Sequence, residues 1–283
     1  MLRYGFLSIF AFLLGLLLPS LCICFVPTVE RSQTGSLSGS AQEHGKIWRE
    51  SLNKQAAGRK AKVHKAIQEN VSKWTLQVNA SGEQAELARY FRAENYILLG
   101  QYSEALKDIE SSPNLALPVK ENSRSRIYAA MGRYDEALSE ISKYNYPNVF
   151  RAYALMKTKR YTAAIRECNR CLRQEDMPEM SYLVKAQAEA ALGNHKKAVA
   201  DFGRALYAST VSEQSFAEYE AGGAYEINTE LRILHNADVY YRRSLSFSAL
   251  KKERQSAADL KKSLKLGYLP GSDACVEIPG LCI

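Results

Sequence analysis

The sequence predicts an all-α protein in which helical hairpins stack into a solenoid. Within residues 178–207, apolar and small residues recur at the spacing of an amphipathic helix, break at Gly193, and resume the same period as far as Leu206. Glycine commonly closes a helix, and two helices joined by so short a turn pack antiparallel. A single hairpin cannot bury its apolar face alone, so we expect this one to be a unit of a stack.

The second helix of this hairpin carries a pattern that recurs along the chain. An aromatic residue follows a turn, and alanine with an aliphatic residue comes three positions later. The aromatic place is taken by Tyr102, Tyr134 and Tyr161, and by His195 in the fourth copy. A weaker fifth copy fits residues 237–266. Several copies in near-register indicate a repeat protein rather than a globule with one central core.

These copies resemble the tetratricopeptide repeat (TPR), a helix–turn–helix unit of about 34 residues. The resemblance covers roughly residues 86–266 and implies a right-handed superhelical solenoid of four to five hairpins, which we place at residues 79–267. Two departures are informative. The third copy follows the second after only 27 residues, so the helix after Tyr134 should end near Tyr144, before Pro147. The excess before the fifth copy predicts a partly helical insertion near residues 209–231.

Three segments precede the repeats. Residues 1–24 carry Arg3 and a long apolar run, which is typical of a signal peptide or a membrane anchor. Residues 25–45 are rich in Ser, Gly and Thr and predict a disordered linker. Their start at Phe25 also resembles the second part of bipartite plastid-targeting leaders. Residues 46–78 predict a basic helical cap on the solenoid, broken near Gly58, with an amphipathic helix lying on a membrane as the alternative.

We therefore expect an exported or membrane-tethered protein outside the cytosol, or import into a plastid as the alternative. The net charge of +8 would suit an acidic partner or an anionic membrane surface. Acidic residues are interspersed with the basic ones, and no basic stripe alternates with aromatic residues, so no nucleic acid is expected as a partner. The acidic residues are expected to be solvated or paired with bases four positions away.

The cysteines and histidines predict no metal site and no cofactor. Cys168 and Cys171 fall on the apolar face of a predicted helix, where buried small side chains are the expected interpretation. Cys275 and Cys282, in the C-terminal tail of residues 268–283, bracket a short loop that could close as a disulfide in an oxidising compartment. The four histidines share no metal-ligand spacing, and no catalytic motif is present. We predict a non-enzymatic protein; a catalytic site assembled from distant repeats is the less favoured alternative.

The TPR resemblance implies an interaction scaffold that binds a peptide segment of another protein in the concave groove formed by the first helix of each hairpin. A membrane-associated or plastid assembly factor is the alternative, and no small-molecule substrate is expected. The family's carboxylate clamp is not reproduced, because only Asn122 and Arg126 match it. The tyrosines at groove positions could instead pack between neighbouring repeats. Transferring the family's groove positions gives Tyr90, Glu94, Asn122, Arg126, Val149, Tyr153, Leu183, Gln187, Tyr241 and Leu245.

Overall fold

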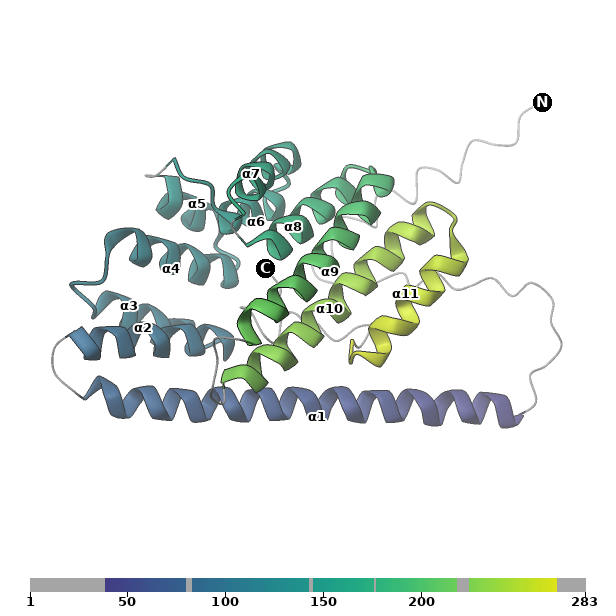
Figure 1. The fold of residues 1–283 in the computed structure, drawn as a ribbon, viewed down its shortest axis with the longest axis horizontal. Helices are drawn as coiled ribbons and strands as arrows, with labels where there is room; N and C mark the ends of the chain where they lie inside the picture. The colour runs from purple at the N-terminus through teal and green to yellow at the C-terminus, as the bar shows by residue number, and fades with distance from the viewer. Residues whose placement is uncertain (1–38, 80–82, 143–144, 176, 218–223, 269–283) are drawn as a thin grey trace, which may run out of the picture. The chain divides into compact units, whose positions relative to one another are not determined.

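The computed structural model describes residues 39–79, 83–142, 145–175, 177–217 and 224–268. Within these ranges the chain forms eleven helices and no strand (Figure 1). Residues from 45 onward belong to one compact unit, and the contacts below concern that unit. The helices are α1 (Gly39–Val78), α2 (Glu83–Leu98), α3 (Tyr102–Glu110), α4 (Leu117–Ala130), α5 (Tyr134–Ser142), α6 (Val149–Lys157), α7 (Tyr161–Arg173), α8 (Pro178–Ala191), α9 (His195–Ala217), α10 (Ala224–Ala249) and α11 (Glu253–Lys265).

Helices α2 to α11 pack in chain order as five hairpins. The pairs are α2 with α3, α4 with α5, α6 with α7, α8 with α9, and α10 with α11, and each hairpin also contacts the next. The second helices of the first four hairpins begin at Tyr102, Tyr134, Tyr161 and His195, where the sequence pattern placed them. The all-α fold, with helices packed sequentially in adjacent pairs, is therefore confirmed for the described residues, and this packing is compatible with a helical repeat.

The same backbone turn joins the two helices of every hairpin. One residue in each turn adopts a left-handed conformation: Gly100, Gly132, Lys159, Gly193 and Lys251, with φ between 57° and 77°. The amide of the next residue donates to a carbonyl five positions back, as from Gln101 to Tyr96 at 2.9 Å and from Asn194 to Glu189 at 2.9 Å. This bond satisfies a carbonyl that the helix end would otherwise leave unpaired. The turn is thus repeated even where lysine replaces glycine.

Each hairpin is also joined by one ion pair between a base on its first helix and an acid sixteen positions later on its second helix. In the first hairpin, Arg92 binds Asp108 through two hydrogen bonds of 2.7 and 2.6 Å. These acids are buried or half-buried, which corrects the expectation that they would be solvated or paired only along one helix. The other four pairs are Arg124–Glu140 at 2.9 Å, Arg151–Glu167 at 3.5 Å, Lys185–Asp201 at 3.6 Å and Arg243–Asp259 at 2.6 Å.

Apolar packing lies between the helices of each pair and between neighbouring pairs. The alanine of the recurring pattern is fully buried at Ala105, Ala137, Ala164 and Ala198. A methyl side chain at these positions lets the two helix axes approach closely, and larger residues fill the remaining volume. Phe202, 1% exposed, packs with residues of α8, α9 and α10 and so joins the fourth hairpin to the fifth.

Helix α1 differs from the expected N-terminal cap. It runs unbroken through Gly58 and begins at Gly39, inside the segment expected to be a linker. A single glycine within a long helix costs only about 1 kcal/mol, which the surrounding helix formers offset. Side chains of α1 reach both ends of the hairpin series: Trp74 stacks on Phe91 of α2 at 4.8 Å, and Arg59 binds Glu230 of α10 at 3.0 Å.

The residues of the predicted insertion extend the end of α9 and the start of α10. Helix α9 extends to Ala217 and α10 begins at Ala224, while residues 218–223 are outside the described ranges. Two leucines near the start of α10 are buried with residues of α1 and of the first hairpin. The first and last hairpins therefore share one apolar cluster, made of Val63, Ala66, Ile67, Leu98, Leu99, Leu231 and Leu234.

Candidate functional site

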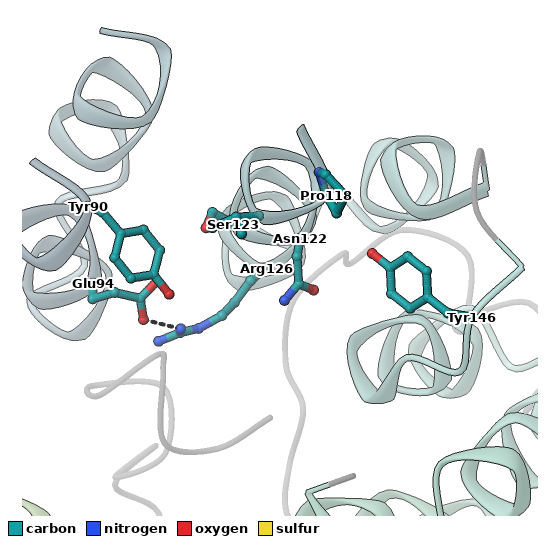
Figure 2. Close-up of a pocket in the computed structure, with 8 residues that line it drawn as sticks. Tyr90, Glu94, Pro118, Asn122, Ser123, Arg126 and Tyr146 are labelled. Atoms are coloured by element: carbon teal, nitrogen blue, oxygen red, sulfur yellow. Dashed lines mark hydrogen bonds and ion pairs between the residues drawn. The ribbon is translucent and has the colours of Figure 1, made fainter. Parts of the chain in front are cut away.

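Four of the residues predicted to bind a partner line one cavity. Tyr90 and Glu94 come from α2, and Asn122 and Arg126 from α4 (Figure 2). The cavity has a volume of about 300 Å³. Its remaining lining residues are Pro118, Val119, Ser123 and Tyr146. Because Tyr146 lies just before α6, the cavity is built jointly by the first three hairpins.

The charged groups of this cavity are already paired. The guanidinium of Arg126 donates a short hydrogen bond to Glu94, and it also lies 5.8 Å from the centre of the Phe150 ring. Burial raises the pKa of the Tyr90 hydroxyl, and the charge of Glu94 raises it further. Tyr90 therefore stays protonated and can donate a hydrogen bond at neutral pH. The cavity has no uncompensated cation to capture a carboxylate.

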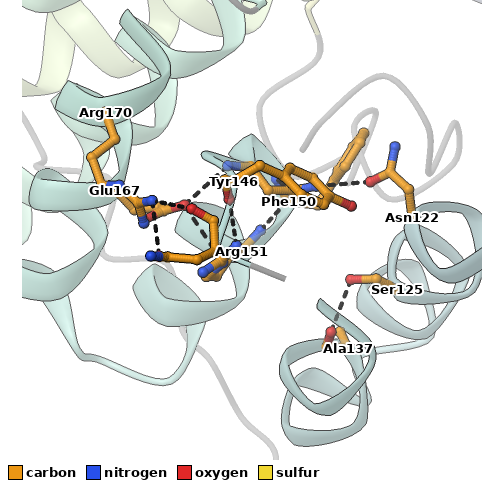
Figure 3. A network of polar contacts seen from close by, with 10 residues as sticks. Asn122, Ser125, Ala137, Tyr146, Phe150, Arg151, Glu167 and Arg170 are labelled. Atoms are coloured by element: carbon orange, nitrogen blue, oxygen red, sulfur yellow. Dashed lines mark hydrogen bonds and ion pairs between the residues drawn. The ribbon is translucent and has the colours of Figure 1, made fainter. Parts of the chain in front are cut away.

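A polar network fixes the amide of Asn122 at the cavity (Figure 3). The Oδ1 atom of Asn122 accepts a hydrogen bond of 2.9 Å from Nδ2 of Asn148. Asn148 is itself the N-cap of α6, where its Oδ1 accepts from the amides of Phe150 at 2.8 Å and Arg151 at 3.1 Å. Because Oδ1 of Asn122 already accepts this hydrogen bond, its Nδ2 group is the part of this side chain that can donate a hydrogen bond to a ligand in the cavity.

The network continues to the second helix of the third hairpin. The buried carboxylate of Glu167 accepts from the backbone amide of Asn148 at 2.9 Å and from Arg170 at 2.9 Å. Arg151 donates to the carbonyl of Tyr146 at 2.6 Å, which holds the segment before α6 in place. The third copy follows the second after a short connection, and Pro147 interrupts the helix within it. This connection thereby places Tyr146 at the wall of the cavity.

The other six predicted residues do not line this cavity. Val149 and Leu183 are each 1% exposed, and Tyr153 is 8% exposed, so these three are core residues rather than accessible ones. Tyr153 packs edge-on against Tyr134, with 6.1 Å between ring centres. For Val149 and Tyr153 the physical reason is that α6 is only nine residues long and is enclosed by its neighbours, whereas Leu183 lies on α8 and is buried in the cluster around Phe202. Packing between neighbouring repeats, the alternative stated above for the groove tyrosines, describes Tyr153, which contacts Tyr134 of the second hairpin.

The three remaining residues are at least partly accessible but lie elsewhere. Gln187 is half-buried on α8, and Leu245 is 48% exposed on α10. Tyr241 stacks on Tyr268 with 4.3 Å between ring centres, so the chain after α11 returns to cover it. Of the ten predicted residues, the four that share a cavity thus come from the first two hairpins, and the other six do not extend that cavity along all five.

Four of the eight residues that line the cavity were not predicted from the sequence. Pro118 and Val119 lie in the first turn of α4, before the helix positions that the family register assigns to the groove. Tyr146 lies outside any helix, and Pro147 beside it was interpreted only as a helix breaker. The 27-residue spacing was the signal that could have identified Tyr146, because a shortened connection must cross close to the preceding hairpin.

The remaining sequence predictions concern the cysteines, metal binding and the N-terminal apolar segment. Cys168 and Cys171 are buried and are not joined in a disulfide, and burial raises the pKa of Cys168. Among the described residues, no three His, Cys, Asp or Glu side chains cluster as metal ligands would. No helix in the described ranges has the length and apolarity needed to cross a membrane. The apolar segment 1–24, residues 25–38 and the pair Cys275 and Cys282 lie outside the described residues.

Comparison of the chain with protein-family models, with curated proteins and with solved structures gave no match.

Proposed function

We propose that this protein is a TPR-like helical scaffold that binds a peptide segment of a partner protein, with the cavity at the first three hairpins as the binding site. The chemistry of the cavity lining is the observation that supports this proposal. It combines apolar walls at Pro118 and Val119 with hydrogen-bond donors at Tyr90 and Asn122. A peptide offers both an apolar side chain and backbone carbonyls, and a volume of about 300 Å³ suits one large side chain with its backbone.

A binding function is favoured over catalysis by the chemistry of the lining. The cavity contains one carboxylate, Glu94, which is paired with Arg126, and it contains no histidine or cysteine. General acid–base catalysis requires an ionisable group free to exchange a proton with a substrate. The paired charges and neutral donors of this site are suited to recognition.

The test uses a library of random twelve-residue peptides displayed on phage and selected on the full-length protein. Enriched peptides are synthesised, and their affinities are measured for the wild type, Tyr146→Ala and Tyr207→Ala. Tyr207 is 72% exposed on α9 and lies outside the cavity, so it is a matched tyrosine control. Truncating an aromatic anchor is worth roughly 1–3 kcal/mol, so Tyr146→Ala should weaken binding by roughly 5-fold to 150-fold.

The control variant should bind as tightly as the wild type, and both variants should keep the wild-type circular dichroism spectrum. Equal affinities for wild type and Tyr146→Ala would place peptide binding elsewhere. Failure to enrich any peptide would overturn the proposal.

A further inference from the structure

The outer face of α11 is basic and exposed along its whole length. Helix α11 is the last helix of the series (yellow in Figure 1) and packs against α10. Its inner side holds Asp259 and Ser263, which are buried. The opposite side is formed by positions i, i+3, i+4, i+7 and i+11 of the helix, which share one face. These five exposed residues, named here the α11 face, are Arg254, Ala257, Ala258, Lys261 and Lys265.

The cations of the α11 face are not neutralised by the part of the protein that the structure describes. None of the three forms a salt bridge with a described residue. The buried Asp259 does not offset them, because its two oxygens accept from Arg243 at 2.6 and 2.8 Å. Lys251 and Lys252, just before α11, are also exposed, and Glu253 is the one exposed acid within residues 251–265. The α11 face is therefore a positive surface that a partner can reach.

The excess positive charge of the chain is concentrated there and in α1. Residues 251–265 contain six Lys and Arg against two Asp and Glu, whereas the first four hairpins, residues 83–217, contain nineteen against seventeen. In α1 two of the cations are paired within the protein, as Arg59–Glu230 at 3.0 Å and Lys65–Glu69 at 3.8 Å. The apolar Val63 of α1 is buried against the hairpins, so that side of α1 does not face a membrane.

The composition of the α11 face favours a lipid surface over a protein or a nucleic acid. Lysine and alanine are depleted from protein–protein interfaces, which use aromatic side chains as anchors, and the α11 face has no aromatic residue. Binding of single-stranded nucleic acid also depends on aromatic stacking. Lysine acts as a point charge, and clusters of roughly four to eight Lys or Arg on one helix are typical of binding to anionic lipid headgroups.

We propose that the α11 face docks this protein on an anionic membrane surface through Arg254, Lys261 and Lys265. The methyl side chains of Ala257 and Ala258 allow the helix to approach the headgroups closely. Membrane tethering is also the expectation from the apolar segment 1–24, which lies outside the described residues. This contact goes beyond the proposed function, since it would hold the scaffold at a membrane whatever peptide the cavity binds.

The experiment measures binding of the full-length protein to vesicles of phosphatidylcholine alone and to vesicles of equal parts phosphatidylcholine and phosphatidylglycerol. The α11 variant combines Lys261→Gln with Lys265→Gln. The control variant combines Lys196→Gln with Lys197→Gln, two exposed lysines of α9, and so makes the same change in net charge. The α11 variant should bind the anionic vesicles about 30-fold more weakly than the wild type, which corresponds to about 2 kcal/mol for two lysines at the surface. The control variant should bind like the wild type.

Lysine acetylation followed by mass spectrometry gives a second readout on the unaltered protein. Lys261 and Lys265 should react more slowly beside anionic vesicles than beside neutral ones, while Lys196 should react equally beside both. Insertion of the apolar segment 1–24 would act on both kinds of vesicle, so it does not produce this difference.

Three results would overturn the inference. They are equal binding of the wild type and the α11 variant to anionic vesicles, equal acetylation of Lys261 and Lys265 beside both vesicles, and protection of these lysines by duplex DNA or polyglutamate in place of anionic vesicles. None of these results bears on peptide binding at the cavity, which is tested separately through Tyr146.

Discussion

Replacing Phe202 by alanine should lower the free energy of unfolding by about 3–5 kcal/mol, the usual cost of deleting a buried aromatic side chain. Phe202 is 1% exposed and packs with Leu183 on α8 and Val239 on α10, so its removal leaves a void between the fourth and fifth hairpins. The free energy is measured by urea denaturation followed by circular dichroism.

The matched control is Tyr207→Ala on the same helix, whose side chain is 72% exposed. This change should alter the free energy of unfolding by less than about 0.5 kcal/mol. Similar losses from the two substitutions would contradict the packing described for α9.

Removing one partner of the ion pair in the first hairpin should also be costly. Asp108→Ala leaves the guanidinium of Arg92, only 16% exposed, without its carboxylate, and should lower the free energy of unfolding by about 3 kcal/mol. The double variant Arg92→Met with Asp108→Leu removes both charges and should recover most of that loss, because no unpaired charge remains. Denaturation midpoints of the single and double variants give the coupling energy.

An exposed ion pair in the second hairpin provides the control. Arg133 and Glu136 are 43% and 50% exposed, and such pairs contribute little to stability. Glu136→Ala should therefore leave the denaturation midpoint nearly unchanged. A loss as large as that of Asp108→Ala would show that burial does not set the strength of these pairs.

The parts of the fold that could be predicted from the sequence are those governed by local rules. Gly193 ends α8 because glycine tolerates a left-handed backbone, and the alanines at 105, 137, 164 and 198 are buried because the helices touch there. The ion pairs were present in the sequence too, sixteen positions apart, but a spacing that joins two helices cannot be interpreted until the turn between them is known. Arg92 and Asp108 illustrate this.

The candidate site was predictable only where the hairpins keep the family spacing. In the first two hairpins, the transferred register placed Tyr90 and Asn122 together at one cavity. In the third hairpin the same register selected Val149 and Tyr153, which the surrounding helices bury. Burial of α6 depends on how the neighbouring helices pack against it, and no local pattern encodes that packing.

Photo-crosslinking tests the central claim, peptide binding at the cavity, most directly. A benzoylphenylalanine is placed at Tyr90 or, as the control, at Tyr207, and each full-length protein is irradiated with a library-selected peptide and analysed by mass spectrometry. The account predicts that the peptide is attached to the protein labelled at position 90 and is not attached to the protein labelled at position 207. Equal attachment at both positions, or attachment at position 207 alone, would contradict it.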